Sequence, residues 1–240
     1  MYSIQFGQDT IPYTIKWSER RKTVSISVDA NGVYVTAPTK TTTEKIKEIV
    51  YQKATWIRAQ LFHFNEMVDE SHHRSFLSGE KLPYLGRNYR LKVYREAVED
   101  VNFSFKQGKF IAVVPSTIFD EQLREMLYPQ FKKWVMTRAK RVAAERVKRY
   151  QLTSNLNPNE IKIKDQQLRW GSCTASGNLI LNWKVFLAPM PVVDYVIAHE
   201  MAHLKVMDHS QKFWETLEML NPAYREKKEW LRLNGRKLYI

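Results

Sequence analysis

The sequence predicts an α+β fold, in which a β-rich amino-terminal part with helices packs on a carboxy-terminal part with a short sheet and one strongly apolar helix. Three observations support this prediction. Residues alternate between apolar and polar with period two from Ile11 to Pro38, as strands do. Apolar residues recur at helical spacing from Leu123 to Val135, and an apolar helix is predicted around residues 192–204. With 240 residues, 44% of them hydrophobic, the chain can bury a substantial core.

The first strands are predicted to form a hairpin. Residues 23–28 and 33–36 alternate with period two, and residues 29–32, Asp-Ala-Asn-Gly, have the composition of a turn. A helix is predicted to begin at Thr43 and to continue as far as Leu61, because apolar residues recur there with helical spacing.

The same plan recurs further along the chain, with strands predicted at residues 89–94, 101–105 and 109–114. Residues 33–38, Val-Tyr-Val-Thr-Ala-Pro, correspond to residues 110–115, Phe-Ile-Ala-Val-Val-Pro, and a tryptophan follows each proline, at Trp56 and Trp134. Either a duplicated strand-strand-helix unit or convergence to one local plan accounts for the match. We expect a β-rich part over residues 1–115 and a largely helical part over residues 116–240.

Three strand-like segments follow the long helical pattern, at residues 160–164, 167–173 and 177–183. Pro189 and Pro191 then mark the start of the apolar helix, because proline is tolerated in the first turn of a helix. The second part is therefore predicted to combine a short sheet with this helix.

The apolar helix carries the pattern H-E-x-x-H, formed by His199, Glu200 and His203, and another histidine follows at His209. On a helix the two histidines of the pattern stand one turn apart on one side, so both imidazoles can reach a single ion. In zinc hydrolases with this pattern, the glutamate takes a proton from metal-bound water. Because the helix is predicted to be buried, its imidazoles and carboxylate need polar partners, which a metal ion with its water supplies. A pair of hydrogen-bonded core histidines is the alternative.

A catalytic zinc ion needs three protein ligands and one open position. His209 is the predicted third ligand, because residues 207–210 indicate a turn that returns this side chain to the ion before the next helix. A carboxylate from that next helix, Glu215 or Glu218, is the alternative ligand. The spacing of the three histidines equals that of the metzincin pattern, but Val206 replaces the glycine of that pattern, which argues against a true metzincin.

Other polar residues are given lesser roles. Asp194 and Glu215 are candidates to accept the second ring N–H of a ligand histidine. His72 and His73 lie in a polar interval and are interpreted as surface residues. Cys173 is interpreted as a small buried residue rather than a ligand.

The net charge is +13, from 38 basic and 25 acidic side chains, and it favours anionic partners. Basic residues recur on more than one face of the helical pattern at residues 132–149, as on a solvated surface or, alternatively, a phosphate-binding face. The single cysteine excludes an internal disulfide framework and fits a reducing compartment. No apolar run approaches the ~20 residues of a membrane span, and the first residues lack the features of a secretory signal. We therefore expect a cytoplasmic protein with no membrane partner.

Four separate stretches carry a family resemblance: R-W-G-S-C at residues 169–173, G-N-L-I-L-N-W at 177–183, the H-E-x-x-H helix at 194–204, and H-S-Q-K-F-W at 209–214. In this order they resemble the YgjP-like family of predicted metal-dependent hydrolases, which is classed with the zincin-like metallopeptidases. The resemblance implies a zincin-like carboxy-terminal part with Zn²⁺ as cofactor. It also implies that His199, His203 and His209 hold the metal and that Glu200 is catalytic.

These observations together predict a zinc-dependent hydrolase, foremost a metallopeptidase that acts on a peptide or protein. The first alternative is a metal-dependent nucleotide (triphosphate) phosphohydrolase or pyrophosphatase, although no phosphate-cradling glycine loop is present. The second is a nucleic-acid-associated protein in which zinc has a structural role.

A peptidase also needs a hydrogen-bond donor for the oxyanion, and Arg169, Tyr195 and Lys205 are candidates. An extended substrate would need the edge of a sheet. The segment at residues 177–183 is the candidate edge strand, with an ordinary interior strand as the alternative.

Overall fold

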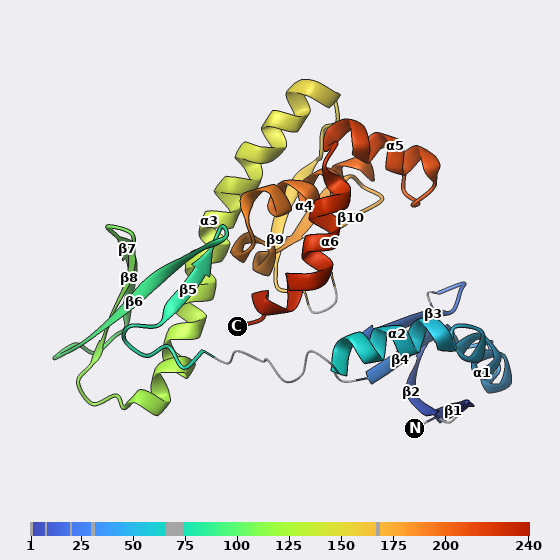
Figure 1. The fold of residues 1–240 in the computed structure, drawn as a ribbon, viewed down its shortest axis with the longest axis horizontal. Helices are drawn as coiled ribbons and strands as arrows, with labels where there is room; N and C mark the ends of the chain where they lie inside the picture. The colour runs from blue at the N-terminus through green and yellow to red at the C-terminus, as the bar shows by residue number, and fades with distance from the viewer. Residues whose placement is uncertain (1, 8, 20, 30–31, 66–73, 167–168) are drawn as a thin grey trace. The chain divides into compact units, whose positions relative to one another are not determined.

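The computed structural model describes residues 2–7, 9–19, 21–29, 32–65, 74–166 and 169–240. The chain forms two compact units, an amino-terminal unit (Met1–Ser71) and a carboxy-terminal unit (His72–Ile240). Both units contain a sheet and helices, which confirms the α+β class (Figure 1). His72 and His73, interpreted from the sequence as surface residues, lie outside the described residues.

The amino-terminal unit holds one four-stranded sheet in the order β1-β2-β4-β3, with two helices. Its elements are β1 (Tyr2–Phe6), β2 (Asp9–Ser18), β3 (Ser25–Asp29), β4 (Gly32–Pro38), α1 (Thr43–Gln52) and α2 (Ala54–Asn65). The predicted hairpin is confirmed as the antiparallel pair of β3 and β4. Alternate residues of β4 are buried, and Val33, Val35 and Ala37 share a core with Ile46 and Val50 of α1.

The carboxy-terminal unit begins with a second four-stranded sheet, in the order β5-β6-β8-β7. Its strands are β5 (Lys81–Tyr84), β6 (Arg87–Glu96), β7 (Asn102–Lys106) and β8 (Lys109–Pro115). The two sheets share one strand order, and β6 runs parallel to β8 as β2 runs parallel to β4. Pro115 is paired with Glu96 in the position where Pro38 is paired with Ser18. The aligned sequence segments thus occupy equivalent strands, while a duplication as their origin stays a prediction.

The long helix α3 (Leu123–Ser154) joins this sheet to the rest of the carboxy-terminal unit (Figure 1). Its buried residues recur every three or four positions, and the Phe131 ring lies 5.4 Å from the Phe110 ring of β8. Because β8 and α3 share one core, the position expected for a boundary, after residue 115, lies inside the carboxy-terminal unit. The chain is divided into its two compact units between residues 71 and 72.

A small sheet and three helices complete the carboxy-terminal unit. The sheet has the order β10-β11-β9, from β9 (Glu160–Lys164), β10 (Gly171–Cys173) and β11 (Asn178–Asn182). A 3-10 turn (Trp183–Leu187) leads to α4 (Met190–Ala202), which is followed by α5 (Gln211–Leu220), α6 (Tyr224–Asn234) and a last 3-10 turn (Gly235–Leu238). None of the helices in the described ranges combines the length and the apolar character needed to cross a membrane.

Candidate metal centre

Helix α4 positions the first two residues of the H-E-x-x-H pattern. Nine of its 13 residues are buried, as the apolar sequence predicts. Its outer side is tied to α3 by an ion pair between Asp194 and Arg146. His199 and Glu200 therefore lie in the last turns of a helix that is fixed to the core, and His203 is its C-cap residue.

The structure brings His199, His203 and His209 together. Each offers one ring nitrogen, and these atoms all lie within 4.8 Å of one another. The Nε2 atoms of His199 and His209 are 3.2 Å apart. Two nitrogens bound to one tetrahedral zinc ion at 2.0–2.1 Å would lie about 3.3 Å apart. The separation of this pair therefore fits two corners of a zinc tetrahedron.

His209 reaches the cluster because the chain turns sharply between α4 and α5. The Asp208 carboxylate accepts the backbone N–H of Ser210 at 3.1 Å, and hydrogen bonding with the side chain and backbone of Ser210 lowers the pKa of Asp208. The Trp214 indole donates from Nε1 to the backbone carbonyl of His209 at 3.0 Å. Ser210 is the N-cap residue of α5, although its side chain makes no capping hydrogen bond. The turn expected after residue 207 is thus present and is held from α5.

The fully buried ring of Phe213 packs against all three imidazoles. Its centroid lies 4.9 Å from that of His199, 4.5 Å from that of His203 and 4.7 Å from that of His209. The sequence identified Phe213 only as an apolar residue of its helix. Its position four residues after His209, one helical turn along, is the signal that would have placed it beside the site.

The imidazoles are suited to a metal ion. Nδ1 of His203 lies 3.1 Å from the backbone carbonyl of Val206, so with the proton on Nδ1 the Nε2 lone pair is left for a ligand. Burial, together with the neighbouring His203 and His209, lowers the pKa of His199 to about 3. The His199 ring is therefore neutral near pH 7, which is the form that binds metal. Nδ1 of His199 is buried without a hydrogen-bond partner among the described residues.

Glu200 lies beside the histidines in a nearly closed environment. Glu200 is only 5% exposed, and this burial raises the pKa of its carboxyl to about 8. The positive charge of Arg169 opposes part of this rise. A Cβ atom at Gly171 would lie 2.7 Å from Oε1 of Glu200. Glycine at the start of β10 therefore makes room for this carboxylate.

A pocket of about 220 Å³ opens beside His199 and Glu200. It is lined by Arg169, Trp170, Gly171, Tyr195, Val196, His199, Glu200 and Leu231. Two of the three donors expected from the sequence line it, namely Arg169 and Tyr195, whereas Lys205 does not. Burial raises the pKa of Tyr195 to about 12, so its hydroxyl keeps its proton and can donate.

The carboxylates considered from the sequence are engaged elsewhere. Glu215 accepts a hydrogen bond from Gln211 at 2.9 Å, and Glu218 forms an ion pair with Arg225 at 2.7 Å. Asp194 binds Arg146. Within the described residues, none of the three belongs to the histidine cluster.

The predicted edge strand is not an edge. In the structure β11 has β10 on one side and β9 on the other, so its backbone groups are used by both neighbours. The edge of this sheet beside Glu200 is β10, which also carries the partly buried Cys173. Burial raises the pKa of this thiol, and it lies outside the histidine cluster.

Comparison with known proteins places these residues within one family model. The model described as "YgjP-like, metallopeptidase domain" matches residues 22–234, a range that includes all three histidines and Glu200. No curated protein gives a significant match. Among solved structures, the crystal structure of the metallopeptidase zymogen of Pyrococcus abyssi abylysin is similar at 18% sequence identity and a TM-score of 0.36. That match covers 38% of this chain and 92% of the other chain.

Proposed function

The chain belongs to the YgjP-like family, and from this premise we propose that it is a zinc-dependent metallopeptidase with Glu200 as its general base. The observation that carries the proposal is the convergence of three histidine nitrogens within 4.8 Å beside a buried glutamate. His199, His203 and His209 would hold the ion. Three imidazoles with one open position are the ligand set of a catalytic rather than a structural zinc site.

When bound, a zinc ion polarises a carbonyl group and lowers the pKa of a coordinated water to about 7. The protein supplies the proton transfers. Glu200 takes a proton from the attacking water and delivers it to the amine that leaves when the peptide bond breaks. Gly171 has no side chain and so leaves room for this carboxylate, and the ring of Phe213 packs against the imidazoles.

A peptide or protein is the proposed substrate, and β10 offers the strand edge along which an extended chain can pair. β10 begins at Gly171, which lies next to Glu200, so a strand added at this edge would lie near the proposed catalytic carboxylate. We retain the cytoplasm as the proposed location, because one cysteine in 240 residues provides no disulfide framework.

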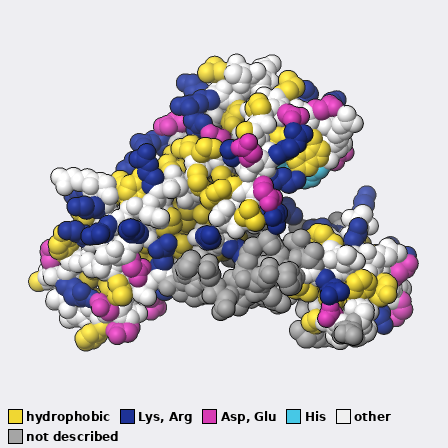
Figure 2. All heavy atoms as spheres, in the orientation of Figure 1, with side chains coloured by type: hydrophobic (Ala, Val, Ile, Leu, Met, Phe, Trp, Pro, Cys, Tyr) yellow, Lys and Arg dark blue, Asp and Glu magenta, His cyan; other side chains and the backbone are white. Residues whose placement is uncertain are grey.

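The alternatives based on charge receive no specific support. Lys and Arg side chains are spread over the visible face of the carboxy-terminal unit rather than gathered around one site (Figure 2). Among the residues that line the pocket, Arg169 is the single Lys or Arg side chain, which is few for a triphosphate. The sequence also contains no phosphate-cradling glycine loop.

A substrate screen tests the proposed reaction. The zinc-loaded protein is incubated with fluorescein-labelled casein and, separately, with nucleoside triphosphates, and Glu200→Ala serves as the matched variant. We expect casein cleavage that is lost in Glu200→Ala. Release of phosphate or pyrophosphate without casein cleavage would contradict the peptidase and favour the phosphohydrolase.

A further inference from the structure

Arg169 lies free to bind a ligand at the pocket beside Glu200. Its guanidinium makes no hydrogen bond or ion pair with any residue in the described ranges, and its charge acts on Glu200 across the pocket. The apolar side chains of Trp170, Val196 and Leu231 line the same hollow. A cation with unused donors beside an apolar wall fits a ligand that carries both an apolar group and a negatively charged oxygen.

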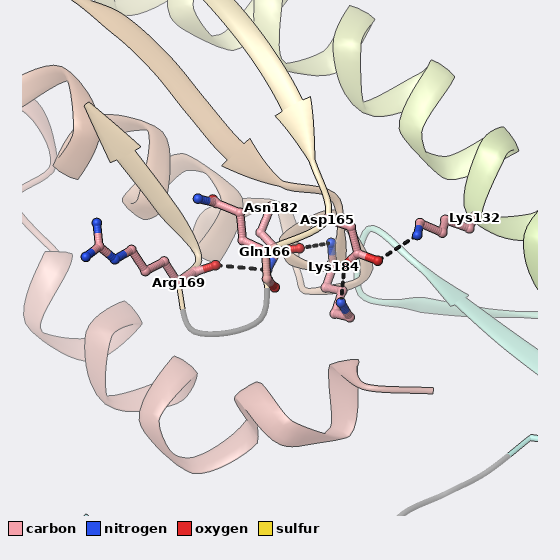
Figure 3. A network of polar contacts seen from close by, with 6 residues as sticks. All are labelled: Lys132, Asp165, Gln166, Arg169, Asn182 and Lys184. Atoms are coloured by element: carbon pink, nitrogen blue, oxygen red, sulfur yellow. Dashed lines mark hydrogen bonds and ion pairs between the residues drawn. The ribbon is translucent and has the colours of Figure 1, made fainter. Parts of the chain in front are cut away.

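The backbone of Arg169 is held by the buried side chain of Asn182. The Nδ2 group of Asn182 donates to the carbonyl of Arg169 at 2.9 Å and to the carbonyl of Gln166 at 2.7 Å. The buried Asn182 amide thus donates its N–H groups to two backbone carbonyls that precede β10 (Figure 3). In the same view the Arg169 side chain extends away from Asn182. The amide therefore fixes the point from which the guanidinium starts.

A second set of contacts anchors the start of this segment. Asp165 forms ion pairs with Lys184, which is 5% exposed, and with Lys132 of α3, whose Nζ lies 2.6 Å from Oδ2 (Figure 3). Lys184 also follows Asn182 closely, and its backbone N–H donates to the Asn182 side-chain oxygen at 3.2 Å. Asp165 and Arg169 are thus each bound to a buried residue, Asp165 to Lys184 and Arg169 to Asn182.

We propose that Arg169 binds a negatively charged substrate oxygen and that Asn182 is the positioning residue that holds Arg169 at the pocket. The oxygen is either a carboxylate of the substrate or the oxyanion that develops at the cleaved carbonyl, and the apolar wall receives a neighbouring side chain. This inference rests on the proposed function, because it assigns the pocket to the substrate of the metal centre.

Calorimetry with benzylsuccinate tests the role of Arg169 without hydrolysis. One carboxylate of this compound can bind zinc, its phenyl ring fits an apolar wall, and its second carboxylate can pair with a guanidinium. For the zinc-loaded protein we expect Arg169→Ala to weaken binding roughly 10- to 100-fold, the value of a charge-assisted hydrogen bond. Arg141→Ala, on α3 and outside the pocket, is the control and should bind like the wild type. Equal binding by the wild type and Arg169→Ala, or no binding by the wild type, would overturn the proposal.

Hydrolysis distinguishes the two sources of the oxygen. If Arg169→Ala lowers kcat/KM by raising KM, the oxygen is a carboxylate of the substrate. If it lowers kcat/KM by lowering kcat, the oxygen is the oxyanion. Guanidinium ion added to Arg169→Ala should restore part of the lost rate and should not rescue Glu200→Ala. Wild-type kinetics in Arg169→Ala with zinc bound would contradict the assignment.

Asn182→Leu keeps a branched side chain and removes the two donors, together with the acceptor of the Lys184 N–H. We expect it to lower kcat/KM roughly tenfold in the wild-type background and no further in Arg169→Ala, because both changes act through the same guanidinium. Equal losses in both backgrounds would show that Asn182 does not act through Arg169. If Asn182→Leu does not fold, guanidinium rescue still tests Arg169. A zinc-loaded wild type that cleaves no peptide would contradict the proposed function instead, and calorimetry would still decide on Arg169.

Discussion

The Nε2 atoms of His199 and His209 lie 3.2 Å apart, although the first belongs to α4 and the second precedes α5. A hydrogen bond between two neutral imidazoles requires one nitrogen to carry a proton, so only the other nitrogen uses its lone pair. A metal ion between the two nitrogens would be bound by both lone pairs. The Phe213 ring packs against both imidazoles, with its centroid 4.9 Å from that of His199 and 4.7 Å from that of His209. This pair is therefore the part of the site that best fits the proposed metal ion.

Replacing His209 removes the proposed ligand that comes from outside α4. We expect His209→Ala to weaken zinc binding by more than about 100-fold, since loss of a ligand should exceed the effect of losing its outer hydrogen bonds. Competition with a zinc chelator measures the affinity. Lys205→Ala, an exposed neighbour outside the cluster, serves as the control. Equal zinc affinity in His209→Ala and the control would mean that His209 is not a ligand.

The indole N–H of Trp214 holds the backbone of His209 at 3.0 Å. Trp214→Phe removes this donor and keeps an aromatic ring beside the imidazole, so we expect zinc affinity to fall roughly tenfold with little change in stability. The same chelator competition and a thermal melt measure the two quantities. A variant that melts early but binds zinc normally would show that this bond serves folding alone.

Gly171 makes room for the Glu200 carboxylate, the proposed general base. In Gly171→Ala the new Cβ would meet Oε1 of Glu200 at 2.7 Å, so the carboxylate must move. We expect casein hydrolysis to fall at least tenfold with zinc content unchanged, because misplacing a catalytic group is costly. Ser172→Ala, at the next position of β10, changes a side chain without adding a Cβ and should retain activity. Full activity in Gly171→Ala would contradict the role of Glu200 in proton transfer.

Because of the ion pairs of Asp165, we expect the free energy of unfolding to depend on pH in the acidic range. Burial alone would raise the pKa of Asp165. Hydrogen bonds from Lys132 and Lys184 outweigh this effect, so the pKa is lowered to about 2. Because this pKa is below the unfolded value of about 3.9, the group stabilises the fold above about pH 4 and loses that contribution as the pH falls towards 2. With partial exposure taken into account, the contribution is about 1 kcal/mol.

Urea unfolding of the wild type and Asp165→Asn measures this dependence. The difference between their free energies of unfolding should be constant near neutral pH and should shrink between pH 4 and pH 2. A difference that stays the same over this range would show that the carboxylate charge does not stabilise the fold.

Local pattern explains which parts of the molecule could be predicted. His199, Glu200 and His203 are close in sequence on one helix, so their spacing already defines how they lie. His209 could be predicted because only a short turn separates it from that helix. Val33 and Val35, like Ala112 and Val114, alternate with their neighbours as strands require, so both central strands were visible.

Long-range packing explains what could not be predicted. The interior position of β11 depends on its pairing with β9, which is parallel and joined through a distant stretch of chain. The shared core of Phe110 and Phe131 shows that β8 and α3 belong to one unit, and no local signal at residue 115 reveals it. Likewise, the hydrogen bond from the buried Asn182 amide to the Arg169 carbonyl links residues that are 13 positions apart in the sequence.

Elemental analysis of zinc in the purified protein tests the central claim most directly. After zinc loading and removal of free metal, we expect about one zinc ion per chain in the wild type and in Glu200→Gln, and none in His199→Ala. Glu200→Gln should bind the ion without cleaving casein, since it keeps the ligands and loses the base. A wild-type protein that takes up no zinc, or a His199→Ala variant that holds it as well as the wild type, would contradict the account.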